Sequence, residues 1–259
     1  MITPRIPILL YHQILSGPSD ARDLGVGVGR FREDMTRLHS RGWRCVPALE
    51  AAELTLAGRR TARTFALTFD DGYRDFAVLV HPILRDLGFT ATVFVVTDRI
   101  GGRADWNGTA ADPLLAADEI RSLVREGVRF GSHCRTHPHV PRCSDRELQD
   151  ELRGSRARLS EVIGGEVETI AWPYGESDLR TRRAAAEAGY GVGFGVAGAG
   201  PLLERARAVV RPAARDRFAV PRREVHGGDS RLRRRLRTGL ADGLFVAARK
   251  LGPVVQGRR

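Results

Sequence analysis

Short apolar runs alternate with longer amphipathic stretches along the first 200 residues, and this alternation limits the fold more than any other feature. The apolar runs have the length of β-strands. Thr90–Thr97 is a continuous apolar and β-branched run, as expected for a strand buried on both faces. Ser144 and Glu147 predict a capping box at the start of a long charged helix. The predicted strands are residues 6–12, 43–46, 64–69, 90–97, 128–132, 168–172 and 190–196, and the predicted helices are residues 31–40, 47–56, 73–87, 117–126, 144–163 and 178–188.

The number of strand–helix alternations predicts the architecture. Strands that alternate with helices build parallel sheets whose faces are covered by the helices. A single α/β barrel typically needs about 250 residues. We therefore interpret the 259 residues as one α/β domain built on a parallel barrel. The reactive residues of such barrels lie at the C-terminal ends of strands, so candidate residues should follow several different predicted strands.

The positive charge is confined to the C-terminal part of the chain. Residues 1–200 carry 26 basic and 26 acidic side chains, whereas residues 201–259 carry 16 basic and 5 acidic ones, which accounts for the net charge of +11. The body of the protein is therefore electrically balanced. The basic part lacks interleaved aromatic residues beyond Phe218 and Phe245 and shows no known nucleic-acid-binding module, which argues against a nucleic-acid partner.

The last predicted element is a basic amphipathic helix within residues 229–259. Its leucines recur every four residues between arginines, at Leu232, Leu236, Leu240 and Leu244. Two interpretations remain open: a final helix that packs its leucines on the barrel, and a helix that makes peripheral contact with an anionic membrane. We therefore divide the chain into a barrel, residues 1–228, and this C-terminal segment.

The N-terminus and the cysteines predict the compartment. Cys45, Cys134 and Cys143 are odd in number and form no CxxC pair, which argues against a disulfide framework. The apolar run Ile6–Leu10 is broken by Pro7 and is shorter than the roughly 7–15 apolar residues of a signal peptide. We expect a soluble cytoplasmic protein, with any membrane contact peripheral and on the inner membrane face.

The first candidate motif is the pair Asp70 and Asp71, which directly follows the strand predicted at residues 64–69. Two adjacent carboxylates at a strand end can have different roles, because one can bind a metal while the other stays ionised as a base beside that cation. The alternative is that Asp71 only caps the helix predicted to begin near Tyr73.

The second motif is the pair His133 and His137, which follows the strand predicted at residues 128–132. Their spacing lets one turn or one tight loop direct both imidazoles to the same point. Two histidines and a carboxylate are a common ligand set for a divalent metal. The alternative is a chance pair of surface histidines.

The third motif is Trp172-Pro173-Tyr174-Gly175, which follows the strand predicted at residues 168–172. Its aromatic side chains could form a wall against a sugar ring. The alternative is an ordinary strand-to-helix turn with a packed tryptophan.

Together, TFDDG at residues 68–72, SHCRTHP at residues 132–138 and PYG at residues 173–175 resemble the motifs of the polysaccharide deacetylase family, the NodB-homology domain of carbohydrate esterase family four. The order and the gaps agree, and the opening run IPILLYH at residues 6–12 is similar to the family's first strand. The resemblance spans roughly residues 6 to 230. It implies a distorted parallel (β/α) barrel of about seven βα units, in agreement with the alternation.

The resemblance also implies residue roles. Asp71, His133 and His137 would bind a divalent metal, in the first place zinc, with cobalt or another divalent ion as alternatives. Asp70 would be the catalytic base. The backbone N–H of Tyr174 would help to bind the oxyanion.

The general acid of the family is a late histidine, and His226 is the only histidine beyond residue 139. An exposed loop histidine is the alternative interpretation. His12, at the end of the first predicted strand, is a lesser candidate because it would also lie at the mouth of the barrel.

Three positions depart from the family pattern. Ala171 stands where the family commonly has an arginine that orients the base, and Arg222 is our suggested substitute. Cys134 stands where serine or threonine is usual, and its thiol is a weaker hydrogen-bond donor. The acidic-tryptophan motif expected between residues 190 and 215 is not recognisable.

We therefore predict a metal-dependent deacetylase that hydrolyses the acetamide of an N-acetylated sugar in an intracellular glycan or glycan precursor. The alternatives are a non-catalytic glycan-binding or scaffolding barrel that retains the metal site, and an O-deacetylase.

Overall fold

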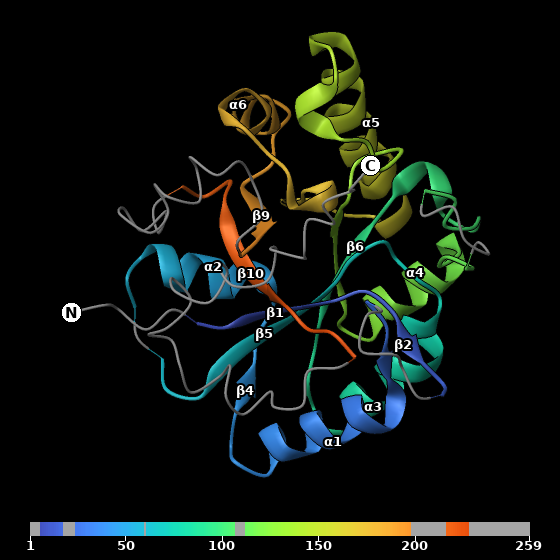
Figure 1. Ribbon diagram of the computed structural model, residues 1–259, viewed down its shortest axis with the longest axis vertical. Coiled ribbons are helices and arrows are strands. Elements are labelled where there is room, and N and C mark those ends of the chain that lie inside the picture. Colours follow the sequence, from blue (N-terminus) through green and yellow to red (C-terminus); the bar gives the residue numbers. More distant parts are fainter. Residues whose placement is uncertain (1–5, 18–23, 60, 107–111, 198–215, 228–259) are drawn as a thin grey trace, which may run out of the picture.

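The computed structural model describes residues 6–17, 24–59, 61–106, 112–197 and 216–227, and its centre is a closed barrel of parallel strands (Figure 1). The first barrel strand pairs on one side with the second and on the other side with the last, which closes the sheet. The predicted parallel barrel of about seven units is therefore confirmed. In chain order the seven strands are β1 (Ile8–Tyr11), β5 (Thr64–Phe69), β6 (Thr92–Val95), β7 (Arg129–Ser132), β8 (Thr169–Ala171), β9 (Val192–Val196) and β10 (Val220–Glu224).

Three very short strands lie outside the ring. β4 (Arg44–Cys45) pairs with the start of β5, while β2 (Ile14–Leu15) and β3 (Val26–Gly27) pair with each other. The strand predicted at residues 43–46 therefore exists, but it is an edge strand of two residues. The ring of seven is completed instead by β10, which pairs with β9 and with β1.

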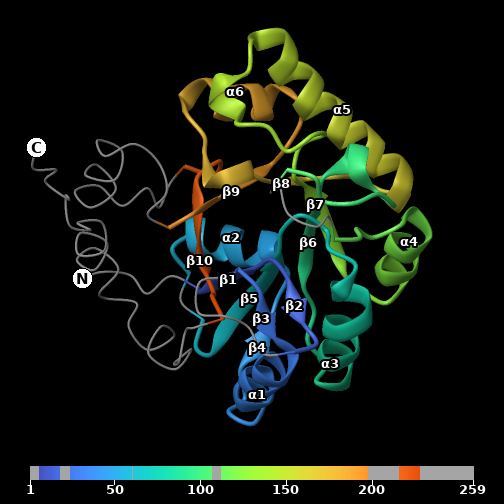
Figure 2. The same ribbon diagram turned by 45° about the vertical axis from the view of Figure 1, so that its right-hand side comes forward.

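Helices surround the barrel, with α5 and α6 at one end of the view and α1 and α3 at the other (Figure 2). The capping box is present, since Ser144 Oγ accepts from Glu147 N at 3.4 Å and Glu147 Oε2 accepts from Ser144 N at 2.8 Å. The helix predicted from residue 73 begins instead at Phe76, so Asp71 does not cap it. The helices are α1 (Val28–His39), α2 (Ala48–Leu56), η1 (Phe76–Val80) continuing into α3 (His81–Asp86), η2 (Thr97–Arg99), α4 (Ala117–Arg125), η3 (Val140–Arg142), α5 (Asp145–Ile163), η4 (Pro173–Gly175) and α6 (Leu179–Glu187).

Strand residues alternate between the barrel interior and the helix layer. Leu9 belongs to the apolar core shared with the helices, whereas its neighbour Ile8 packs in a second cluster with Phe94 and Phe194. The Arg222 guanidinium lies 5.3 Å from the centre of the Phe94 ring and 6.0 Å from that of Phe194. The interior is therefore an apolar packing of aromatic and aliphatic groups that also contains one buried cation.

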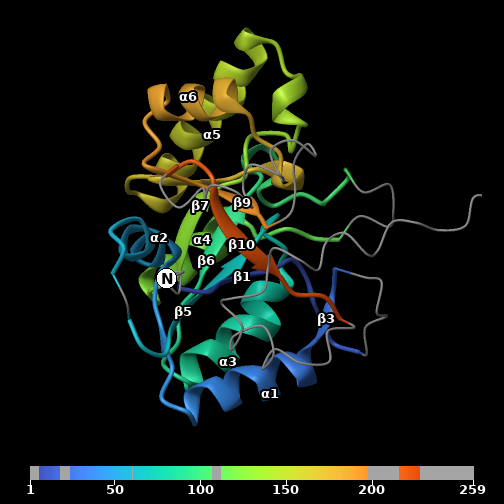
Figure 3. The ribbon, with the colours of Figure 1, turned by 60° about the vertical axis from the view of Figure 1, so that its left-hand side comes forward.

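Closure of the barrel places the two ends of the described chain side by side. β10 runs parallel to β1, with Leu9 paired to Arg223 and Leu10 to Glu224 (Figure 3). The residues that follow β1 and β10 therefore reach the same end of the barrel as the residues that follow β5. The predicted boundary at residue 228 and the helix predicted within residues 229–259 lie outside the described residues. Among those described, no helix is long and apolar enough to cross a membrane.

Candidate active site

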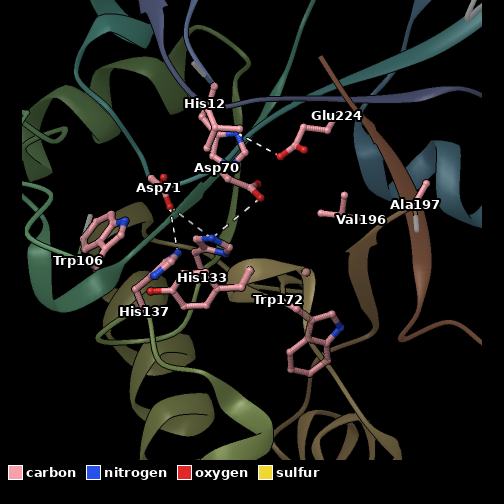
Figure 4. Close-up of a pocket in the computed structure, with 13 residues that line it drawn as sticks. His12, Asp70, Asp71, Trp106, His133, His137, Trp172, Val196, Ala197 and Glu224 are labelled. Atoms are coloured by element: carbon pink, nitrogen blue, oxygen red, sulfur yellow. Dashed lines mark ion pairs between the residues drawn. The ribbon is translucent and has the colours of Figure 1, made fainter. Parts of the chain in front are cut away.

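The predicted site residues except His226 meet at the C-terminal ends of the strands, around a cavity of about 420 Å³ (Figure 4). The two aspartates follow β5, the two histidines follow β7, and Tyr174 follows β8. His12 follows β1, and Glu224 is the last residue of β10. The lining residues are His12, Leu24, Asp70, Asp71, Trp106, His133, His137, Trp172, Tyr174, Gly175, Val196, Ala197 and Glu224.

Asp71, His133 and His137 form a buried cluster of metal-ligating groups. The Nε2 atoms of His133 and His137 lie 3.4 Å and 3.3 Å from the same oxygen, Asp71 Oδ1. One donor atom from each of the three residues lies within 4.8 Å of the other two. His133 Nδ1 is 2.8 Å from the carbonyl oxygen of Ala171, which orients that ring and leaves Nε2 directed at the cluster.

These three residues fit a divalent cation. Asp71 Oδ1 is buried and has no hydrogen-bond partner within the described part of the chain, as a carboxylate oxygen reserved for another ligand would be. Burial by itself raises the pKa of Asp71, but the neighbouring His133 and His137 hold it well below the usual range. Burial lowers the pKa of His137, which keeps its imidazole neutral and able to ligate.

The pKa of His133 is shifted upward, opposite to that of His137. Burial lowers its pKa, but the charges of Asp70 and Asp71 outweigh burial and raise it. The same negative charge that would hold a proton on His133 attracts a cation to the cluster. The site therefore has the donor set and the charge that zinc and similar ions prefer.

The backbone around the cluster is strained. Asp71, Cys134, His137 and Tyr174 have φ values of 71°, 64°, 66° and 58°, in the left-handed region that side chains other than glycine rarely adopt. Such conformations persist where the surrounding structure enforces them, and they concentrate at functional sites. Gly72 is required beside Asp71, because an added Cβ would lie 2.8 Å from Val95 Cγ1.

Asp70 is held by a buried, bidentate ion pair with Arg222. Arg222 Nη1 and Nη2 donate to Asp70 Oδ1 and Oδ2, each at 2.6 Å, and the arginine side chain is completely buried. Burial raises the pKa of Asp70, but the charges of Arg222 and His133 together with the Arg222 hydrogen bonds outweigh burial, so the pKa lies below its usual range. Arg222 thus contacts the carboxylate that the missing arginine at Ala171 would contact, as the sequence suggested.

At the end of β8, the ring of Tyr174 is exposed to solvent, whereas the ring of Trp172 is not. The Trp172 ring is fully buried and donates through Nε1 to the carbonyl oxygen of Phe218 at 2.9 Å, so it cannot serve as an open aromatic wall. Tyr174 is 43% exposed, and its ring stacks on His139 with centres 4.0 Å apart. The half-buried Trp106 stacks on His137 with ring centres 4.8 Å apart, and the Tyr174 ring lies edge-on to His137 at 4.6 Å, so both aromatic side chains flank this histidine.

The two candidate acids differ in position. His12 lines the cavity, and its Nδ1 lies 3.9 Å from Glu224 Oε1 (Figure 4). His226 lies on the other side of this carboxylate, with Nε2 3.1 Å from Glu224 Oε2, and it is not among the lining residues. Assignment of His226 as the acid therefore stays a prediction, while the lesser candidate His12 occupies the site.

Sequence reasoning missed Glu224 and Trp106. Trp106 sits in a stretch expected to be a loop, with no flanking motif to mark it. Glu224 could have been found from its alternation with Arg222, because residues two apart on one strand point to the same side of a sheet.

A sequence profile of the family described as polysaccharide deacetylase matches residues 57–193. The match covers more than half of the chain and includes Asp70, Asp71, His133, His137 and Tyr174. The chain therefore belongs to the polysaccharide deacetylase family, which the resemblance had predicted.

Individual relatives agree with this assignment. YxkH of Bacillus subtilis (strain 168), named as a polysaccharide deacetylase, is 27% identical over 190 residues, which cover 73% of this chain and 63% of that protein. The poly-beta-1,6-N-acetyl-D-glucosamine N-deacetylase of Escherichia coli (strain K12) is 23% identical over 203 residues, 65% of this chain and 30% of that protein. The match thus spans less than two thirds of the length of these curated relatives.

The fold is also that of solved deacetylases. The Streptococcus pyogenes deacetylase PplD, solved in complex with acetate, superimposes with a TM-score of 0.70. The superposition covers 86% of this chain and 93% of that chain, at 23% sequence identity. At this identity the likeness establishes the barrel fold.

Proposed function

We propose that this protein is a metal-dependent deacetylase that hydrolyses the acetamide of an N-acetylated sugar in a glycan or glycan precursor. One observation carries the proposal: a buried Asp-His-His cluster and a separately held aspartate open into the same cavity. A binding site needs no base held beside its metal ligands, whereas hydrolysis does. Family membership and the N-deacetylase relative support the reaction class.

Asp71, His133 and His137 would hold the cation through one carboxylate oxygen and two imidazole nitrogens. A divalent ion at such a site supplies Lewis acidity, which acidifies a water molecule and polarises a carbonyl group. We propose zinc first and cobalt or another divalent ion as alternatives, because the donor set accepts several ions. His133 keeps its ligating orientation through its contact with the Ala171 carbonyl oxygen.

Asp70 is the proposed general base. Its Oδ2 lies 4.0 Å from His133 Nε2, so the carboxylate borders the cluster without belonging to it. Arg222 keeps Asp70 ionised and in place. Asp70 then accepts a proton from the attacking water as the water adds to the acetamide carbonyl carbon.

Tyr174 and His12 complete the proposed reaction. The backbone N–H of Tyr174 would donate to the carbonyl oxygen as negative charge develops on it. We propose His12 as the general acid that protonates the departing sugar amine, because His12 lines the cavity and His226 does not. The products are acetate and the free amino sugar.

An O-deacetylase is the second candidate, because the same residues would also hydrolyse an ester. A non-catalytic glycan-binding barrel is a weaker one, since its main support was Ala171, and Arg222 makes the missing contact from another strand. We further propose that the substrate is intracellular and that residues 229–259 contact an anionic membrane surface. The charge of that segment supports the proposal.

A substrate screen tests the function. The protein, stripped of metal and then supplied with zinc or cobalt, is incubated with N-acetylglucosamine oligomers and with O-acetylated sugars, and released acetate is measured. We expect acetate release from the N-acetylated sugars that depends on added metal and is lost in Asp70→Asn. Bound metal without acetate release from any substrate would favour the glycan-binding barrel.

A liposome flotation assay tests the membrane contact. The full chain and a chain lacking residues 229–259 are mixed with vesicles that contain anionic lipid. Binding should require the segment and should weaken as salt is added. Equal binding by the shortened chain would exclude this role for the segment.

A further inference from the structure

The loop that carries both histidine ligands is anchored from outside the cluster by one carboxylate of α5. Glu151 Oε2 accepts hydrogen bonds from the backbone N–H groups of Arg135 and Thr136, at 2.7 Å and 3.1 Å. Its Oε1 accepts from the hydroxyl of Thr136 at 2.6 Å. Glu151 is only 9% exposed and therefore buried against the loop, although glutamate is seldom fully buried without partners.

These contacts fall between the two strained residues of the loop. Cys134 and His137 both have a positive φ, and Arg135 and Thr136 are the two residues between them. Such a backbone needs partners that hold it, since a relaxed loop would leave the left-handed region. Charge-assisted hydrogen bonds to backbone N–H groups are well suited to this, being stronger than neutral ones.

Two further contacts show how closely the loop is fitted. From η2, the backbone N–H groups of Thr97 and Asp98 donate to the carbonyl oxygens of Cys134 and Arg135, at 3.1 Å and 3.0 Å. On the α5 side, an added Cβ at Gly154 would lie 2.5 Å from Arg135 Cδ. The loop is thus held by both η2 and α5: Asp98 of η2 pairs with the Arg135 side chain at 2.9 Å, and Glu151 of α5 binds the backbone N–H groups.

We infer that Glu151 is a positioning residue of the metal site: it sets the separation and direction of the His133 and His137 imidazoles by holding the two residues between them. The inference rests on the proposed function in one respect, namely that Asp71, His133 and His137 bind a divalent cation. It assigns to α5, which contributes no ligand, control over the affinity of that site.

The experiment measures metal binding by the full chain, independently of activity. Zinc affinity of the metal-free protein is determined by competition with a chromophoric chelator, and the visible absorption of bound cobalt reports the coordination geometry. The variants are Glu151→Gln, which introduces an N–H₂ group opposite backbone donors, and Glu161→Gln as the matched control. Glu161 lies on the same helix, is 72% exposed at its side chain, and pairs only with Arg158 in the contacts described.

We expect Glu151→Gln to weaken zinc binding about 10–100-fold, the usual effect of losing a group that orients metal ligands. The cobalt spectrum should change in intensity or position, and Glu161→Gln should leave both readouts unchanged. Thermal unfolding of the metal-free variants separates the two roles. A purely structural Glu151 would lower the unfolding temperature while leaving affinity and spectrum as in the unaltered chain, and that result overturns the inference.

A second variant covers the case in which Glu151→Gln does not fold. Thr136→Val removes only the hydroxyl that donates to Glu151 Oε1, and Thr136→Ser restores it. We expect weaker zinc binding in Thr136→Val and recovery in Thr136→Ser, and unchanged binding in Thr136→Val overturns the inference. If the unaltered chain binds no divalent cation, the proposed function fails as well; if it binds one and Glu151→Gln binds it equally, only this inference fails.

Discussion

The two halves of the candidate active site are built in different ways. The proposed metal half consists of Asp71, His133 and His137, which come from the loops after β5 and β7 and lie within the segment that matches the family profile. The proposed proton-transfer half consists of Asp70 and the groups around it, Arg222, His12 and Glu224. All three of these supporting groups come from the first and last barrel strands, outside the matched segment.

The halves also differ in the forces that hold them. In the metal half, hydrogen bonds from α5 hold the strained backbone of the histidine loop, and Asp71 Oδ1 has no hydrogen-bond partner among the described residues. The proton-transfer half is a saturated ion pair deep in the barrel, where each carboxylate oxygen of Asp70 accepts from Arg222. Metal binding and proton transfer should therefore be separable by mutation, because Asp70 and Asp71 are adjacent in the chain but are held by different groups.

The largest effect should come from separating the neighbouring aspartates. Asp70→Asn removes the base and should lower kcat about 10²–10⁴-fold, the usual contribution of acid–base catalysis, while zinc affinity stays within a few-fold. Asp71→Asn should instead weaken zinc binding and lose activity for that reason. Parallel measurement of kcat and zinc affinity checks both, and equal loss of affinity in the two variants would show that the halves are not separable.

The two histidines near Glu224 can be compared directly to find which of them is the general acid. His12→Ala should reduce kcat about 10²–10⁴-fold, since the departing amine would lose its proton donor. His226→Ala should reduce kcat less than about tenfold because His226 lies outside the cavity lining. Steady-state kinetics on the N-acetylated substrate decides, and a larger loss in His226→Ala would restore the acid that the sequence predicted.

Arg222→Ala tests the ion pair as a structural element. It leaves the buried Asp70 carboxylate without its partner, which typically costs about 3–5 kcal/mol of stability. Arg129→Ala, at an exposed position of β7, is the control and should change the unfolding free energy by less than about 0.5 kcal/mol. Urea unfolding of the metal-free proteins measures both, and a loss below about 1 kcal/mol for Arg222→Ala would contradict the assigned role.

Asp75 concerns the attachment of the His12 segment and the pH dependence of stability. Its Oδ2 accepts from the backbone N–H of Ile14, two residues after His12, and burial raises its pKa to about 7. The folded protein then binds more protons than the unfolded chain between about pH 4 and pH 7. Stability should therefore be greatest below this window and should fall as pH rises through it, by at most about 1.4 kcal/mol per pH unit.

Asp75→Asn keeps an oxygen acceptor for Ile14 but cannot ionise, so its stability should depend less on pH across that window. Asp86→Asn is the control, because Asp86 is exposed on α3. Thermal unfolding of the metal-free proteins at pH 5 and pH 8 provides the measurement. An unchanged pH dependence in Asp75→Asn would mean that Asp75 does not titrate in this range.

Much of the metal half was predictable from local sequence. Each of its motifs directly follows an apolar strand, and in a parallel barrel all strand ends meet at one rim, so Asp71, His133 and His137 were expected to converge. The motif after β8 left two interpretations open, an aromatic wall and a packed tryptophan, and the fully buried ring of Trp172 agrees with the second. No local signal separates a packed tryptophan from an exposed one when both follow a strand.

By itself, the sequence predicted the barrel from strand periodicity, and its short motifs, through their resemblance to the family, predicted Asp71, His133 and His137 as metal ligands and Asp70 as the base. The tertiary structure decided which groups support them. Arg222 reaches Asp70 across 152 residues of chain, and Glu151 reaches the ligand loop from a different helix. The preference for His12 over His226 as the acid also comes from the structure, since it is argued from the cavity lining. The physical reason is barrel closure: pairing of β1 with both β5 and β10 brings distant side chains within hydrogen-bonding range, and no local pattern records that distance.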